Sequence, residues 1–207
     1  AAVREQRWQE GTEVFDAIVR EHPDNYWLPL AYGHMYRERD PERTEALYRR
    51  AADGFRLHGN IEGEIVWRSN LRNFLFHKGR PQDAATELAR VLALEESARD
   101  PLLKAQIWTL EALHLQETGG DLGVAYRLLK QAQRATFPAG PYRLKRNCLS
   151  SLAIVAFRMG RLDEALAIYK TLEQLAAAER DPREQAAARY SILNVSSTKE
   201  SLLPTPG

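Results

Sequence analysis

The side chains best suited to metal binding or nucleophilic catalysis are scattered singly along the chain. They are five histidines and one cysteine: His22, His34, His58, His77, His114 and Cys148. No two histidines have the four-residue spacing that places zinc ligands on one helix face. Basic neighbours would lower the pKa of the Cys148 thiol, but no histidine lies beside it to act as a base. We therefore expect a buried, unreactive thiol, no metal site, no cofactor and no enzymatic activity.

A second group of candidate residues is basic. The run PYRLKRN, residues 141–147, places Arg143, Lys145 and Arg146 near the start of a predicted helix. Such a cluster can attract an acidic segment of a partner protein. The whole chain, however, has 29 basic and 28 acidic side chains, so no general positive field favours nucleic acid. We expect a protein or peptide partner and no nucleic acid.

Cysteine use and hydropathy bear on location. A single cysteine excludes an internal disulfide, and no apolar run reaches the roughly 20 residues of a membrane-spanning helix. The first residues also lack the apolar core of a secretory signal. These features predict a cytoplasmic protein that does not enter a membrane, and the excess of arginine over lysine hints at a bacterial source.

These side chains are carried by a series of predicted helices. Good helix formers dominate, apolar residues recur three and four positions apart, and no alternating strand pattern is present. Asp40-Pro41, Asp100-Pro101 and Asp181-Pro182 each place an N-capping carboxylate before a proline. Glu184 adds a predicted capping box with Asp181. Gly79, Gly119-Gly120 and Gly160 mark the predicted helix ends.

The second helix of each predicted pair repeats one pattern. A small residue is followed by an apolar residue four positions later and another three positions after that. The sets are Gly11/Phe15/Ile18, Thr44/Tyr48/Ala51, Ala84/Leu88/Val91, Ala125/Leu129/Ala132 and Ala165/Tyr169/Leu172, spaced by 33, 40, 41 and 40 residues. Such spacing is typical of stacked helical hairpins, whose units cannot bury their apolar faces alone.

These residues resemble the tetratricopeptide repeat family, whose pattern is W-x2-L-G-x2-Y, then A-x3-F, then P. WQEGTEVFDAIVREHP follows the second part as far as Pro23, and Tyr32, Gly33 and Tyr36 follow the first. The period of about 40 residues is similar to that of a long-helix subgroup. The resemblance implies an all-α fold, a right-handed superhelix of stacked antiparallel helix pairs. A generic α-solenoid of the HEAT type is the alternative.

The resemblance divides residues 1–207 into one solenoid of six parts. They are 1–24 (second helix only), 25–58, 60–98, 101–137, 141–178 and 181–207 (first helix only). This pattern predicts an excerpt of a longer array, which could self-associate through exposed ends.

In this family the first helix of each unit lines a concave groove. Carried over, this implies a peptide-binding surface formed by Trp27, His34, Arg37, Asn73, Phe76, Thr109, Gln116, Asn147, Ser150, Phe157 and Arg158. The lysines of the family's clamp for a C-terminal carboxylate are absent. The resemblance implies a scaffold that binds a peptide or partner helix along the groove. The alternative is a ligand-sensing or autoinhibitory regulatory arm of a larger bacterial signalling or protease-type effector protein.

Overall fold

The chain forms two compact units, Ala1–Ser97 and Ala98–Gly207. The computed structural model describes residues 2–28, 33, 36–137 and 139–202. Within these ranges the regular elements are all α-helices and no strand is present. The predicted all-α class is therefore confirmed.

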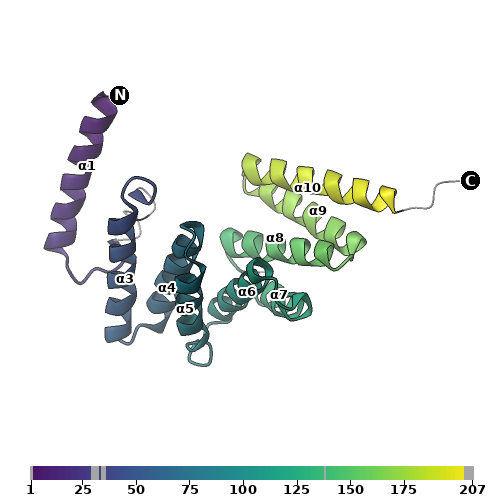
Figure 1. The fold of residues 1–207 in the computed structure, drawn as a ribbon, viewed down its shortest axis with the longest axis horizontal. Coiled ribbons are helices and arrows are strands. Elements are labelled where there is room, and N and C mark those ends of the chain that lie inside the picture. Colours follow the sequence, from purple (N-terminus) through teal and green to yellow (C-terminus); the bar gives the residue numbers. More distant parts are fainter. Residues whose placement is uncertain (1, 29–32, 34–35, 138, 203–207) are drawn as a thin grey trace, which may run out of the picture. The chain divides into compact units, whose positions relative to one another are not determined.

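Unit 1 contains α1 (Ala2–Glu21), α3 (Pro41–Leu57), α4 (Ile61–His77) and α5 (Pro81–Leu92). Helix α3 packs against α4, and α4 packs against α5, as Figure 1 shows. Aromatic rings fill the space between α3 and α4: the Tyr48 ring lies 5.3 Å from Trp67 and 5.9 Å from Phe74, and all three are buried. An ion pair between Asp16 of α1 and Arg43 of α3 joins these two helices.

Unit 2 contains α6 (Pro101–Thr118), α7 (Leu122–Thr136), α8 (Tyr142–Arg158), α9 (Leu162–Ala178) and α10 (Pro182–Ser201). Each helix packs against the next one in the chain, and α6 also packs against α8. Figure 1 shows α8, α9 and α10 in that order within the unit. The core is aliphatic, with Leu129, Leu149 and Leu152 fully buried.

Local sequence signals set the starts of these helices. The predicted caps are confirmed, since Asp40, Asp100 and Asp181 each accept a backbone N–H bond at the start of α3, α6 and α10. The capping box at Asp181 is only half formed. Asp181 Oδ1 accepts from the Glu184 N–H at 3.0 Å, but the Asp181 N–H donates to the Ala176 carbonyl at 2.9 Å. The preceding helix end thus satisfies the donor that Glu184 was expected to bind.

The ends of five helices share one geometry. A residue in the left-handed region follows each helix, and the next N–H donates to a carbonyl five residues back, as in a Schellman motif. The left-handed residues are Gly59, Gly79, Gly119, Gly160 and Arg180. The matching bonds are Asn60→Phe55, Arg80→Leu75, Gly120→Leu115, Arg161→Ala156 and Asp181→Ala176, at 2.8–3.0 Å. The predicted glycine stops at Gly79, Gly119 and Gly160 are therefore confirmed.

The small–apolar–apolar pattern is buried in four of its five occurrences. All twelve residues of the sets that begin at Thr44, Ala84, Ala125 and Ala165 are at most 8% exposed. The set in α1 differs, because Gly11 is exposed and Ile18 is 36% exposed. A Cβ at Gly11 would meet only the Tyr36 hydroxyl, at 3.8 Å, so no close helix approach explains a small residue there.

Polar side chains also link alternate helices. In unit 1, Arg49 of α3 pairs with Glu87 of α5 at 3.2 Å. In unit 2, the Tyr126 hydroxyl of α7 donates to Glu164 of α9 at 2.6 Å. A helix therefore contacts both its neighbour and the next helix beyond, as expected for stacked helix pairs. Among the described residues, no helix is long and apolar enough to cross a membrane.

Candidate functional site

One face of α8 is open to solvent. It carries Arg143, Asn147, Ile154 and Arg158, which we call the α8 row. Their spacing of four, seven and four residues keeps them on one side of a helix with 3.6 residues per turn. The opposite side carries the buried residues Leu149, Leu152 and Ala156. Ile154 is 40% exposed, so this row places an apolar side chain between two guanidinium groups.

The α8 row continues to the end of α6. Arg158 Nη1 donates to the Gln116 carbonyl at 3.0 Å, where the last turns of α6 and α8 lie together. A cation at these helix ends is favoured by the partial negative charge of their free carbonyls. The Gln116 amide nitrogen is buried and has no hydrogen-bond acceptor among the described residues. The structure therefore brings the predicted residues Gln116 and Arg158 together.

Other predicted groove residues in unit 2 are less accessible. Thr109 is only 7% exposed, and its hydroxyl donates to the Ala105 carbonyl at 2.7 Å, so its side chain belongs to the interior. Phe157 packs against the apolar core, and Ser150 is half-buried. Asn147 is exposed, and its Oδ1 accepts from Arg146 Nη2 at 3.0 Å.

Two predicted residues of unit 1 are joined by a buried cation. Asn73 Oδ1 accepts from Arg72 Nη1 at 3.1 Å, and the Arg72 guanidinium lies 5.0 Å from the centre of the Phe76 ring. Arg72 itself is 1% exposed, so it fixes both side chains from within the unit. Arg37 contacts Glu38 at 3.6 Å with a third of its side chain exposed. His34 lies outside the described residues.

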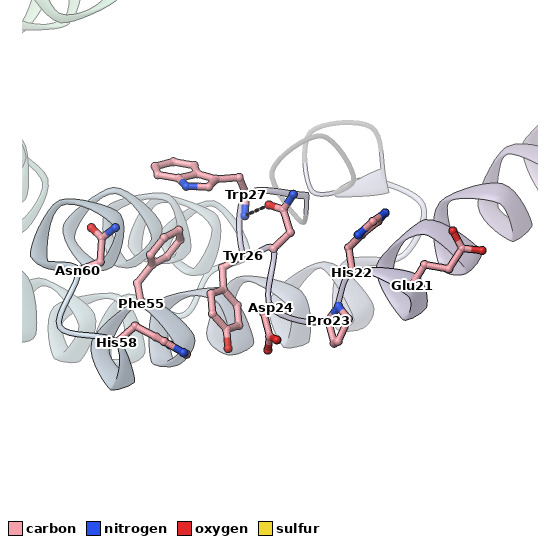
Figure 2. Close-up of a pocket in the computed structure, with 10 residues that line it drawn as sticks. Glu21, His22, Pro23, Asp24, Tyr26, Trp27, Phe55, His58 and Asn60 are labelled. Carbon is pink, nitrogen blue, oxygen red and sulfur yellow. Dashed lines mark hydrogen bonds between the residues drawn. The ribbon is translucent and has the colours of Figure 1, made fainter.

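Trp27 lies in a different setting, at an open hollow of about 600 Å³. The end of α1, the following loop and the junction of α3 with α4 form this Trp27 hollow. Its lining is Glu21, His22, Pro23, Asp24, Asn25, Tyr26, Trp27, Phe55, His58 and Asn60. Figure 2 shows Trp27 and His22 on one side, with Tyr26, Asp24 and His58 on the other.

The aromatic rings of the hollow are held in place by α3. The Trp27 ring packs edge-on against Phe55 with centroids 4.9 Å apart, and Tyr26 packs against the same ring at 5.6 Å. Gly54 leaves room for the Tyr26 ring, because a Cβ there would lie 2.3 Å from it. The backbone N–H of Trp27 donates to Asn25 Oδ1 at 3.2 Å, and the residue is 49% exposed. The hollow thus presents an ordered but accessible tryptophan.

Sequence reasoning missed a network of buried charges in unit 1. Arg68, 4% exposed, donates to Glu64 at 2.7 Å and to Glu87 at 3.0 Å. Glu87, 2% exposed, also accepts from Arg49 at 3.2 Å and from Arg90 at 2.8 Å. Burial lowers the pKa of Arg68, but its bonds to Glu64 and Glu87 outweigh this and raise the pKa. The Glu64/Arg68 spacing of four residues was a local signal, but it could not show that the pair is buried.

Cys148 is buried, as predicted, and its Sγ donates to the Leu129 carbonyl at 3.5 Å. Burial raises the pKa of this thiol to about 12, against smaller lowering effects of Thr109 and Lys130. At neutral pH the side chain is therefore a protonated thiol within the core of unit 2. Across the part of the chain that the structure describes, no group of three or more His, Cys, Asp or Glu residues could hold a metal ion.

Taken together, the elements define an all-α protein built from consecutively packed helices with accessible polar and aromatic side chains on two of its surfaces. Searches of protein-family models and of curated proteins find no match to the chain.

Proposed function

We propose that the chain is a tetratricopeptide-like repeat protein that works as a scaffold, and that it binds a segment of a partner protein along the exposed side of the first helix of a repeat unit. The observation that carries this proposal is the α8 row, where Ile154 is 40% exposed between Arg143 and Arg158. The repeated helix pairs and the exposed Asn147 amide support it. No nucleic acid, membrane, cofactor or catalytic step is part of the proposed function.

The α8 row favours a segment with a particular composition. An apolar side chain of the partner can cover Ile154, and acidic side chains can pair with the arginines on either side. The Asn147 amide can hydrogen-bond to the backbone of an extended chain. Because these groups are solvent-exposed, each ion pair contributes about 1 kcal/mol or less, and the apolar contact provides the anchor.

The proposal is tested with an array of extended peptides that vary in apolar and acidic content. Binding should be strongest for peptides that combine both, and Arg158→Glu should weaken it roughly three- to tenfold. Ile154→Ser removes the apolar anchor without touching a charge, and Asn73→Ala probes the corresponding position in unit 1.

Lys170→Glu is the matched control, since it reverses a charge at an exposed position of α9 away from the row. Equal binding by the parent protein and by the Arg158, Ile154 and Asn73 variants would refute the proposed surface. An equal loss with the Lys170 control would show that only the net charge matters.

A further inference from the structure

We propose that the chain forms a symmetric dimer through α10, in which this helix packs antiparallel against α10 of a second copy. The surface involved is the exposed side of α10, which we call the α10 row: Arg183, Ala186, Tyr190, Leu193, Ser197 and Glu200. It shares no residue with the α8 row, so this inference goes beyond the proposed function and does not depend on it.

The spacing of the α10 row is the first reason. Its members are three, four, three, four and three residues apart, which is the repeat of the positions that face a partner helix in a coiled coil. Helix α10 is continuous over Pro182–Ser201, so all six side chains lie along one side of it. The other side carries Ala188 and Val195, which are buried in the core of unit 2. Figure 1 shows α9 lying along α10 within this unit.

The centre of the α10 row is apolar and open to solvent. Tyr190 and Leu193 are 66% and 68% exposed, although both are large and mainly apolar. Ala186 and Ser197, on either side of them, are small and uncharged, so a second helix can come close. A helix that covers these residues removes apolar surface from water, which favours association.

The α10 row is complementary to itself when two copies run in opposite directions. A twofold axis midway between residues 191 and 192 gives an isologous contact, in which the same surface is used by both copies. Three kinds of facing pair then form on each side of the axis, one apolar, one small and one oppositely charged: Tyr190 with Leu193, Ala186 with Ser197, and Arg183 with Glu200. In a parallel pair, by contrast, each charged residue would face its own counterpart.

The two charges of the α10 row also suit a second helix better than their own. A cation is unfavourable near the positive N-terminal end of a helix, and an anion is unfavourable near the negative C-terminal end. Arg183 lies in the first turn of α10, and Glu200 lies in the last turn. In the antiparallel dimer each of them lies beside the opposite end of the second helix, where the dipole and the facing charge both favour it.

Neighbouring charges of α10 are used within the unit. Arg189 and Lys199 each pair with a carboxylate of α9. Arg183 and Glu200 are exposed, and neither takes part in an ion pair among the described residues. They are 17 residues apart, or about 25 Å along the helix, so they cannot pair with each other within one copy. An ion pair between them forms only between copies.

Sedimentation equilibrium of the full chain over a range of concentrations tests the association. A contact made by one helix from each copy is small, so we expect a dissociation constant of about 10–100 μM. Leu193→Asp buries a charge at the centre of the contact and should weaken association about tenfold or more. Lys170→Glu, at an exposed position of α9, is the matched control and should leave it unchanged.

Charge reversal separates the proposed ion pair from a general effect of charge. Arg183→Glu and Glu200→Arg should each weaken association about five- to thirtyfold, because each places like charges opposite each other twice in the dimer. The double variant has the net charge of the parent protein and should recover most of the lost affinity. Because the two residues cannot interact within one copy, this recovery can arise only between copies.

Cysteine cross-linking tests the direction of the two helices. Under mild oxidation, a mixture of the Ala186→Cys and Ser197→Cys proteins should form a mixed disulfide, because these positions face each other. Either protein alone should cross-link poorly, since its two introduced cysteines are separated by about 16 Å along the helices. The native Cys148 is buried and does not interfere. Rapid cross-linking of each protein with itself would show a parallel pair and overturn the proposal.

Three other results would also overturn it. They are a monomer at every concentration up to several times the expected dissociation constant, association that survives Leu193→Asp, and an equal loss in the Lys170→Glu control. Leu193→Asp should leave peptide binding to the α8 row unchanged, because the two surfaces share no residue. The dimer and the proposed function therefore fail separately.

Discussion

Replacing Arg68 by methionine tests how the buried charges of unit 1 contribute to its stability. Arg68 lies on α4 and donates to Glu64, to Glu87 of α5 and to Asp53 of α3, so one side chain connects three helices. Methionine keeps much of the apolar stem and removes the charge. The variant therefore isolates the guanidinium from the packing of its methylene groups.

The size of the effect follows from burial. The Asp53 side chain is 56% exposed, so losing its ion pair with Arg68 costs little stability. The side chains of Glu64 and Glu87 are only 8% and 2% exposed, so losing their ion pairs with Arg68 matters more. In the variant, Glu87 still pairs with Arg49 and Arg90, but the buried Glu64 has no other ion-pair partner among the described residues. Removing one partner of a buried ion pair costs about 3–5 kcal/mol of unfolding free energy. Arg56→Met, at a 3.9 Å pair whose two side chains are each 56% exposed, should cost below about 0.5 kcal/mol.

Urea unfolding followed by tryptophan fluorescence measures these values. Trp8, Trp27 and Trp67 lie in unit 1, and Trp67 is fully buried next to Arg68, so the signal reports mainly on this unit. Adding Glu64→Leu to Arg68→Met should restore part of the lost stability, because it removes the unpaired carboxylate. A loss of less than about 1 kcal/mol for Arg68→Met, or no recovery in the double variant, would refute the reasoning.

Two further predictions concern unit 2. Arg180 has a φ of 55°, where the equivalent turns have glycine. Arg180→Gly should therefore raise the unfolding free energy by about 0.5–1 kcal/mol, and Gly160→Arg should lower it by a similar amount. Unchanged urea midpoints in both variants would contradict this prediction. Cys148 should react with a thiol reagent only in urea at neutral pH, and reaction of the folded protein would show that it is accessible. The folded-state pKa of the Cys148 thiol, about 12, lies above the ordinary value of 9.0. The stability that the protonated thiol contributes is therefore complete below pH 9 and is lost as the pH rises toward 12. Stability should thus fall over this range less steeply in Cys148→Ala than in the parent protein.

The features predicted correctly from sequence are mostly local. An aspartate before a proline and a glycine after a helix act within four or five residues, so Asp40 and Gly160 could be placed from the sequence alone. The repeat pattern was also visible, because burial of Ala125, Leu129 and Ala132 depends on their spacing within one helix. The unexpected exposure of Ile18 shows where this reasoning ends.

Features that depend on several segments were not predicted. Arg68 and Glu87 are 19 residues apart on different helices, and only their packing shows that the pair is buried. Thr109 was expected on an accessible surface because of its repeat position, but it turns inward and bonds to its own helix. Trp27 was selected, whereas the hollow around it combines three segments and was not foreseen.

The turns after four helices have a consequence for how the chain can vary. Nothing lies within 4 Å of a Cβ built at Gly59, Gly79, Gly119 or Gly160, so these corners project into empty space. A side chain at these positions would meet no neighbouring atom, whereas an insertion inside a helix would rotate its apolar face away from the core. We therefore expect the chain to tolerate extra residues better at these corners than within the helices.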